Sequence, residues 1–447
     1  MKLPRYPVYK NSGVAWLGSV PAYWSTRRLG YFFAERREKV SDRDFPPLSV
    51  TKNGVVPQLQ TAAKSDDSDN RKKVCNGDFV INGRSDRKGS SGMAETDGSV
   101  SLINIVLCPV GGIDIRFAHH LLRSVPFQEE FYRYGKGIVA DLWSTNYSEM
   151  RNISLSLPSI AEQSAIAAFL DRETAKIDAL IAEQERLLEL LAEKRQAVIS
   201  HAVTKGLNPD APMKDSGVAW LGEVPAHWRV GKAGFYVSVL PGFAFSSSGF
   251  SEEVTDVRLL RGINVGVGEI RWEDVVYWRR ESDDGLEPFE LQEGDVVIGM
   301  DRPVISGGVR VSIITPRDLP CLLLQRVAKI QPGEQMRGRF IARMLSSHAF
   351  GPHFLPETTG VSVPHISGEQ IAAFVVPVPP VEEQDAICNF IDAALAEIDA
   401  LVDEAKKGIA LLFERRSALI AAAVTGQIDV RVAAYGPPLP PPFIAVE

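Results

Sequence analysis

Apolar side chains recur at spacings of three, four and seven residues through two long stretches of the chain, with mostly polar or charged residues between them. The repeating positions are Ile166, Leu170, Ile177, Leu180, Leu187, Leu191 and Val198 in the first stretch, and Ile387, Ile391, Ile398, Leu401, Leu412 and Leu419 in the second. This spacing gathers the apolar side chains along one side of an α-helix. The pattern therefore predicts two helices of about 45 residues, each roughly 65 Å long.

The limits of the first helix can be read from single residues. Ser159 and Glu162 follow Pro158 in the pattern of a capping box, in which the two side chains satisfy free amide groups of the first turn. No proline follows until Pro209, beyond Gly206. In the second helix glycine replaces the equivalent of Leu187, so we expect looser packing at that point.

The same sequence frame occurs twice in the chain. Asn11–Trp24 and Asp215–Trp228 are identical at 11 of 14 positions, and 22 of 47 positions are identical between Pro158–Thr204 and Pro379–Thr425. The offset grows from 204 to 221 because the intervening segment is 17 residues longer in the second half. The sequence therefore predicts a tandem duplication with pseudo-two-fold symmetry.

Helices of this length need a partner along their whole course, and the most economical partner for each is its duplicate. We expect an antiparallel intramolecular coiled coil, which would hold two dissimilar domains at its opposite ends. The alternative, in which each helix packs only on its own domain, explains the length poorly.

The segments between the frames, about residues 25–157 and 229–378, differ from each other in sequence. Short extended pieces are predicted at 47–51, 77–82, 101–107, 258–261, 269–272, 294–299 and 310–314, with helices near 117–123 and 339–346. The first segment therefore predicts a mixed α/β or mostly β domain, and the second offers the same kinds of element. Gly77-Asp78 and Gly294-Asp295 suggest that one fold underlies both.

Basic and small polar residues follow each Gly-Asp strand, and arginine in such a loop can read guanine edges while glycine and serine allow close approach to a DNA backbone. A second polar and aromatic group precedes each long helix. The candidate DNA-binding residues are Arg84, Ser85, Arg87, Lys88, Lys136, Trp143, Asp301, Arg302, Thr359 and Ser362. For each of them a solvated loop or a core position is the competing interpretation.

Composition narrows the function further. A net charge of −7 argues against indiscriminate coating of DNA but allows local basic surfaces. The four cysteines lack zinc-site spacing, and no nucleotide-binding, metalloprotease or hydrolase motif is found, so the sequence predicts a chain without a catalytic centre. With no signal peptide or membrane-length apolar run, we expect a cytoplasmic protein.

The duplicated Gly-Val-Ala-Trp-Leu-Gly…Val-Pro-x-x-Trp, together with the duplicated Pro-x-x-x-Glu-Gln that opens each helix, resembles the specificity (HsdS-type) subunits of type I restriction–modification systems over residues 8–430. The resemblance implies an α+β fold with two mixed α/β target recognition domains separated by the two long helices. It predicts domain 1 at residues 1–157, a helix at 158–206, domain 2 at 207–378, a helix at 379–430 and a flexible proline-rich tail at 431–447.

The resemblance further implies that each domain reads one half of a bipartite target in double-stranded DNA, and that the helices set the spacer and dock two methyltransferase subunits. Motor-nuclease subunits would complete a complex that methylates adenine and cleaves DNA in phage defence. S-adenosylmethionine, ATP and Mg are expected on the partner subunits, with no cofactor in this chain. The candidate partner-binding residues are Glu162, Gln163, Glu383 and Gln384.

Two other classes of function remain open at this point. A helical scaffold that binds only proteins would show no sequence-specific DNA affinity. A DNA reader fused to an unrecognised enzyme is less favoured, because both variable segments sit where recognition domains are expected.

Overall fold

The computed structural model describes residues 4–60, 69–137, 143–305, 308–347, 350 and 364–431. They divide into two compact units, the first within residues 1–185 and 407–447 and the second within 186–406. The tail predicted at 431–447 lies outside the described residues from position 432 onward. Each unit is described below by itself.

The first unit is built on a four-stranded antiparallel sheet in the order β10-β9-β12-β4. Its strands are β4 (Phe33–Glu35), β9 (Phe79–Asn82), β10 (Ser91–Met93) and β12 (Asn104–Pro109). Helices α1 (Ile115–Arg123) and α2 (Val125–Arg133) pack against it through Phe117, Phe127 and Phe131, which are fully buried. Burying each of these rings contributes roughly 1.5–3 kcal/mol of transfer free energy.

A smaller sheet and a hairpin complete this unit. The sheet has the order β11-β8-β5, and β6 pairs with β7 in the hairpin. The bounds are β5 Lys39–Val40, β6 Leu48–Thr51, β7 Gly54–Pro57, β8 Arg71–Val74 and β11 Gly98–Val100. Helix α2, which the sequence interpretation omitted, follows α1 after the capping residue Ser124.

The second unit repeats the four-stranded sheet in the order β17-β25-β20-β23, with α5 (Gly338–Leu345) packed beside it. The strands are β17 Val237–Pro241, β20 Val296–Gly299, β23 Val311–Ile313 and β25 Val327–Pro332. Its second sheet, β19-β18-β24, begins with β19 (Tyr277–Trp278). It differs from that of the first unit because β18 (Val257–Leu260) and β24 (Cys321–Leu323) are parallel. The strand predicted at 269–272 is wrong, since only an isolated bridge at Ile270 is present.

The Gly-Asp pairs mark the same turn in both units. Gly77 and Gly294 each adopt a φ of 87°, which favours glycine. The carboxylate of Asp78 accepts a hydrogen bond from the backbone N–H of Cys75, and that of Asp295 accepts one from Gln292, at 2.8 Å in each case. The predicted common fold is therefore seen in the described sheets and in the turns that precede β9 and β20.

The frame closes each unit with a pair of short strands. β3 (Ser25–Arg28) pairs with β13 (Ser154–Leu157), and β16 (Arg229–Lys232) pairs with β26 (Val375–Val378), all antiparallel. Each variable segment therefore leaves and re-enters the frame at one place.

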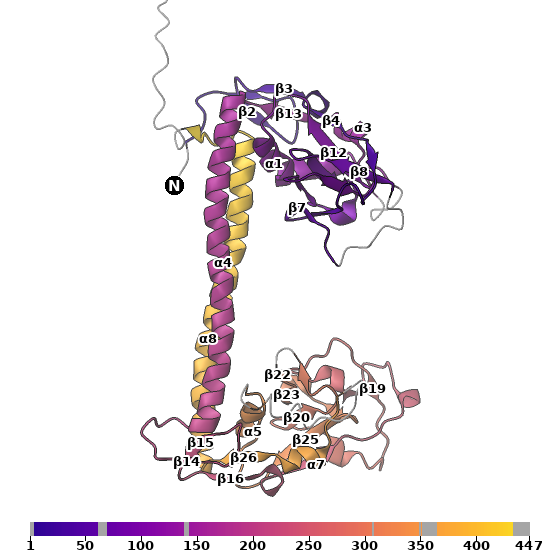
Figure 1. Ribbon diagram of the computed structural model, residues 1–447. Helices are drawn as coiled ribbons and strands as arrows, with labels where there is room; N and C mark the ends of the chain where they lie inside the picture. The colour runs from indigo at the N-terminus through magenta and orange to yellow at the C-terminus, as the bar shows by residue number, and fades with distance from the viewer. Residues whose placement is uncertain are drawn as a thin grey trace, which may run out of the picture. The chain divides into compact units, whose positions relative to one another are not determined.

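The long helices are α4 (Ile160–Lys205) and α8 (Val381–Val424), close to the predicted limits, and they pack against each other (Figure 1). In the first unit Ile166 and Leu170 of α4 share a core with Ala423 and Val424 of α8. In the second unit Leu191, Ile199 and Val203 of α4 pack in one core with Ile387, Ile391 and Ile398 of α8. The start of one helix thus lies beside the end of the other, so they are antiparallel as predicted.

The apolar stripe is not buried throughout. Leu180 and Leu401, both expected in the helix contact, are 51% exposed. Leu187 is also exposed, whereas Ile177 and Ile181 beside it in the sequence are buried. Because two antiparallel helices contact through a narrow seam, the outer positions of a wide apolar stripe stay in solvent.

Candidate nucleic-acid interface

The loop that follows β9 carries four of the predicted DNA-binding residues on a rigid base. Asn82 at the end of the strand is buried, and its side-chain oxygen accepts a hydrogen bond of 3.0 Å from the backbone N–H of Arg84. A single 3-10 turn, Ser85–Arg87, then directs the loop outward. The side chains of Arg84, Arg87 and Lys88 are 44%, 68% and 46% exposed, and they form ion pairs with Asp86 and Glu129 at the surface.

A second segment, residues 143–145 before α4, is hydrogen-bonded to this loop. The backbone N–H of Thr145 donates to the carbonyl of Gly83 at 2.9 Å, and that of Ser85 donates to Trp143 at 3.0 Å. Lys136 in turn exchanges two backbone hydrogen bonds with Ser144. We call this arrangement, residues 83–85 with 143–145, the first clasp. The clasp brings the two predicted groups of the first half together.

Gly83 is required by the closeness of the two segments. A Cβ atom at this position would lie 2.7 Å from the carbonyl oxygen of Thr145, which is shorter than real contacts allow. The clasp therefore needs glycine here for space, whatever its backbone angles.

Three hollows surround the loop, and a different side chain of the loop lines each. Arg84 lines one of about 720 Å³ together with Lys39 and Lys72, and Arg87 lines one of about 630 Å³. Lys88 lines a third of about 440 Å³. Concave surfaces that hold basic side chains next to an exposed loop suit contacts with a nucleic-acid backbone and its base edges.

The second unit holds the corresponding loop in the same way. Met300 accepts a hydrogen bond of 2.9 Å from the backbone N–H of Ile366, as Gly83 does from Thr145. Asp301 and His365 form a β-bridge, as Arg84 and Ser144 do. We call residues 300–302 with 364–366 the second clasp.

The charge carried at the second clasp differs from that at the first. The Asp301 carboxylate accepts hydrogen bonds from Arg326 at 2.8 Å and lies 2.7 Å from His365 Nδ1. Burial opposes ionisation of Asp301, but its contacts with His365 and Arg326 outweigh burial and lower the pKa of this carboxyl. An aspartate therefore stands where the first unit has Arg84.

Arg302 adopts a φ of 44°, in the left-handed region, and its backbone N–H donates to Pro364 at 2.7 Å. Thr359 and Ser362 lie outside the described residues. Arg326 was not singled out from the sequence, because only the folded chain brings a residue 25 positions away to Asp301. None of the predicted DNA contacts is tested by this geometry, and each stays a prediction.

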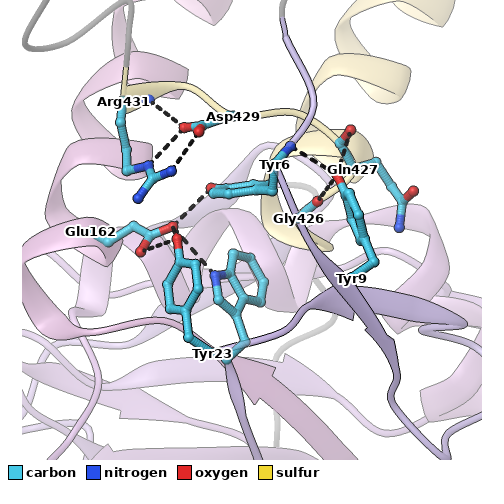
Figure 2. Close-up of polar contacts among 9 residues, drawn as sticks. Tyr6, Tyr9, Tyr23, Glu162, Gly426, Gln427, Asp429 and Arg431 are labelled. Carbon is cyan, nitrogen blue, oxygen red and sulfur yellow. Dashed lines mark hydrogen bonds and ion pairs between the residues drawn. The ribbon is translucent and has the colours of Figure 1, made fainter. Parts of the chain in front are cut away.

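Glu162, predicted to bind a partner, is an acceptor within the chain (Figure 2). Its carboxylate accepts hydrogen bonds from the hydroxyls of Tyr6 at 2.8 Å and Tyr23 at 3.0 Å, and from Trp24 Nε1 at 3.3 Å. Ser159 still caps the first turn, with its hydroxyl 3.4 Å from the backbone N–H of Glu162. The predicted capping box is thus only half formed, because the carboxylate is turned toward the tyrosines.

The chain ends that the structure describes meet at this point. Arg431 pairs with Asp429 at 2.6 Å, and its guanidinium lies 5.0 Å from the ring centre of Tyr6. Tyr9 donates through its hydroxyl to the carbonyl of Gly426 at 3.0 Å (Figure 2). Burial, followed by the Glu162 charge, raises the pKa of both Tyr6 and Tyr23, so both stay protonated donors.

The other three partner candidates are also engaged within the chain. Gln163 is buried and accepts a hydrogen bond from the backbone N–H of Asp114 at 2.9 Å, and the buried Gln384 accepts one from Arg337 at 2.8 Å. These two glutamines tie each long helix to its own domain in the same manner. Glu383 lies 2.8 Å from His227 Nε2 and is partly exposed. Whether any of the four contacts a partner stays a prediction.

No group of three or more histidine, cysteine or acidic side chains among the described residues could hold a metal ion. No helix in the described part of the chain has both the length and the apolar character needed to cross a bilayer.

Known proteins similar to this chain point to one family. This chain is 33% identical over 216 residues to the specificity subunit of the Escherichia coli type I restriction enzyme EcoAI, and the match covers 48% of this chain and 36% of that subunit. It is 28% identical over 281 residues to the specificity subunit of the type I restriction enzyme MjaVIII of Methanocaldococcus jannaschii, covering 63% of each. The matches thus span less than two thirds of the length of these relatives. No family model matches the chain.

Solved structures agree on the fold. A chain from a structure on complex assembly and conformational transition of the type I R-M system superimposes with a TM-score of 0.68 at 16% identity, over 91% of this chain and 98% of that one. The HsdS subunit of Thermoanaerobacter tengcongensis gives a TM-score of 0.52 at 18% identity, over 92% and 98%. The resemblance first drawn from the duplicated motifs is confirmed by sequence and by fold.

Proposed function

Because the chain has the sequence frame and the fold of HsdS-type specificity subunits, we propose that it is the non-catalytic DNA-reading subunit of a type I restriction–modification complex. Each unit reads one half of a bipartite target in double-stranded DNA. Methylation of adenine and cleavage of DNA belong to the methyltransferase and motor-nuclease subunits, which carry S-adenosylmethionine, ATP and Mg.

The two clasps are the observation that carries this proposal. Matched backbone hydrogen bonds hold a loop in each unit, but the equivalent positions carry Arg84 in one and Asp301 in the other. A protein that reads two different half-sites needs this combination of equal placement and unequal side chains, because phosphate contacts fix position and side chains on base edges give sequence preference. A scaffold that binds only proteins needs neither.

Exchange of one variable segment tests the proposal directly. Ser25 and Leu157 are paired residues of β3 and β13, so both ends of the segment 25–157 join the frame at one point. Replacing this segment with that of a relative should change one half-site and spare the other in methylation maps of cells that also express the methyltransferase. Replacing 229–378, which joins the frame at Arg229 and Val378, should give the reciprocal result. Change of both half-sites by either exchange would contradict the proposal.

Two copies of the methyltransferase subunit dock on the long helices in this proposal. Leu180 with Leu411 in the first unit, and Leu190 with Leu401 in the second, are exposed by 51%, 64%, 46% and 51%. The repeat relates Leu180 to Leu401 and Leu190 to Leu411, so each unit offers the same pair, one leucine from each helix. Exposed apolar side chains that recur in both units suit two copies of one partner.

Native mass spectrometry of the assembled complex tests the docking. Leu180→Glu with Leu411→Glu should reduce the number of bound methyltransferase copies from two to one, and Leu190→Glu with Leu401→Glu should do the same. All four changes together should leave none. Retention of both copies by the fourfold variant would show that these leucines are not the docking surface.

The non-catalytic assignment has its own assay. The purified chain alone should transfer no methyl group from S-adenosylmethionine to target DNA, and activity should appear only when the methyltransferase subunit is added. Methyl transfer by the chain free of that subunit would overturn the assignment.

A further inference from the structure

The hollow that Lys88 lines, about 440 Å³ in volume, also holds basic side chains from three other parts of the first unit, with Glu129 as the acidic residue in its lining. Lys52 comes from the turn between β6 and β7, Arg123 from the end of α1, and Arg416 from α8. Two of the cations are matched by carboxylates, since Lys88 pairs with Glu129 and Arg416 pairs with Asp178 at 2.8 Å.

Arg123 lines this hollow without a carboxylate partner among the described residues. Its guanidinium lies 3.0 Å from His119 Nε2 and donates to the backbone carbonyl of Lys52, and neither of these groups carries a negative charge. None of the described carboxylates pairs with Arg123 or Lys52. Burial lowers the pKa of Arg123, and the charge of Arg416 adds to the effect, so this guanidinium lies in an environment that disfavours its charge. A partly desolvated cation without a counter-charge is costly, and a bound anion offsets that cost.

Arg123 is also not needed to join the domain to the helix. That contact is made by Asp171 of α4, which lies 2.6 Å from His120 Nε2 and 3.8 Å from Arg116. In the second unit the repeat-related Asp392 of α8 pairs with Arg339 and Arg343 of α5. The repeat-related aspartates, Asp171 and Asp392, therefore already have basic partners in both units.

We infer that this hollow binds a phosphate of the DNA backbone, with Arg123 as the central ligand and Lys52 and Arg416 beside it. The inference rests on the proposed function. It extends the DNA contact to Arg416 of α8, a helix that carries no base-reading loop. Lys88 belongs both to the loop that follows β9 and to this hollow. A DNA strand in contact with Arg84 and Arg87 of the same loop would therefore also reach the hollow. An arginine fork matches the oxygens of a phosphodiester, and contacts of this kind place a protein on the duplex without reading sequence.

The test measures DNA binding by the chain assembled with its methyltransferase partner, using fluorescence anisotropy of labelled duplexes with and without the target. Arg123→Gln should weaken binding to both duplexes about tenfold. It should also reduce the slope of log affinity against log salt by about 1, which is the loss of one phosphate contact. Arg123→Lys, which keeps the charge, should recover most of the slope.

Arg416→Ala has a matched control in the same coiled coil. The repeat relates Arg416 to Arg195, which pairs with Asp399 in the second unit as Arg416 pairs with Asp178 in the first. Both substitutions remove the same kind of ion pair between α4 and α8, but only Arg416 lines the hollow. Arg416→Ala should therefore lower the salt slope, and Arg195→Ala should leave it unchanged.

The outcomes separate this inference from the function on which it rests. Sequence-specific binding by the wild-type complex, with affinity and slope unchanged in Arg123→Gln and Arg416→Ala, would overturn the phosphate site and leave the proposed function intact. Equal loss of slope in Arg195→Ala and Arg416→Ala would also overturn it, because the effect would then come from the helices. A wild-type complex that binds neither duplex would overturn both.

Discussion

Asp178 of α4 and Arg416 of α8 form an ion pair, with Arg416 Nε 2.8 Å from the carboxylate, and the duplication repeats it with the helices exchanged. Asp178 is equivalent to Asp399, and Arg416 to Arg195, and these two residues pair in the second unit. Each pair links α4 to α8 through repeat-related positions. All four side chains are about a third or more exposed, so each pair contributes little to stability.

These repeat-related pairs allow a clean test of whether the helices set the spacing between half-sites. One heptad inserted between Glu185 and Arg186, and another between Lys406 and Lys407, falls at the boundary of the two units in both helices and leaves both ion pairs in place. A heptad keeps the apolar stripe aligned and adds about 10 Å of helix. The spacer in the recognised DNA should lengthen by about three base pairs while both half-site sequences persist.

Methylation maps of the double insertion give the result, and an insertion in α4 alone is the control. The single insertion shifts one helix against the other and should reduce assembly. A soluble, active double-insertion protein that keeps the original spacer would show that the helices do not set it.

Glu162→Gln should destabilise the first unit by about 1–3 kcal/mol, because two tyrosine hydroxyls and an indole N–H lose the carboxylate on which they converge. The matched control is Glu383→Gln, at the repeat-related position. There the carboxylate contacts His227 on the surface, and the Trp228 indole N–H has no hydrogen-bond partner among the described residues. That change should cost less than about 1 kcal/mol. Urea unfolding compares the two, and equal losses would contradict the assigned role of Glu162.

His119 should make the first unit sensitive to acid. Burial, followed by the nearby charges of Arg123, His120 and Arg416, lowers its pKa from 6.5 to about 3. The backbone N–H of Met93 donates to Nδ1 of its ring, so protonation of that nitrogen would remove the acceptor, and the added charge would lie beside Arg123. The folded state then binds fewer protons than the unfolded state between these two pKa values. The stability that His119 contributes is complete above pH 6.5 and is lost as the pH falls toward 3.

Unfolding by urea at a pH of about 7.5 and again at about 5 should show this loss, with His119 accounting for up to about 2 kcal/mol of it. His119→Gln cannot be protonated and should lose less stability over the same range. If the variant and the wild type lose stability in parallel, His119 is not the sensitive group.

Gly83→Ala should open the first clasp, because the added methyl group would lie 2.7 Å from the Thr145 carbonyl. We expect destabilisation of about 1–3 kcal/mol and relaxed preference at the first half-site only. Gly262→Ala, whose Cβ would meet nothing closer than 3.8 Å, is the control and should preserve both half-sites. Methylation maps with unaltered preference in Gly83→Ala would remove the clasp from the recognition machinery.

The sequence by itself determined the frame of this protein. The linear order of residues was enough to predict the duplication, the two helices and their antiparallel pairing, and the Gly-Asp turns. It also showed that recognised catalytic motifs are absent. Helix periodicity and turn chemistry depend on neighbours in sequence, and for that reason both limits of α4 and the start of α8 were predicted within two residues, whereas α8 ends six residues before the predicted limit.

Tertiary structure decided the rest, because it brings together residues that sequence order keeps apart. Only the fold shows that Leu180 and Leu401 point away from the helix contact, or that Glu162 turns from its expected cap to Tyr6, which is 156 residues away. In the same way, nothing in the sequence near Arg123 links it to Lys52 or Arg416. Their shared hollow exists because two domain segments and the end of a distant helix pack at one place, and packing of this kind depends on shape and burial and not on local pattern.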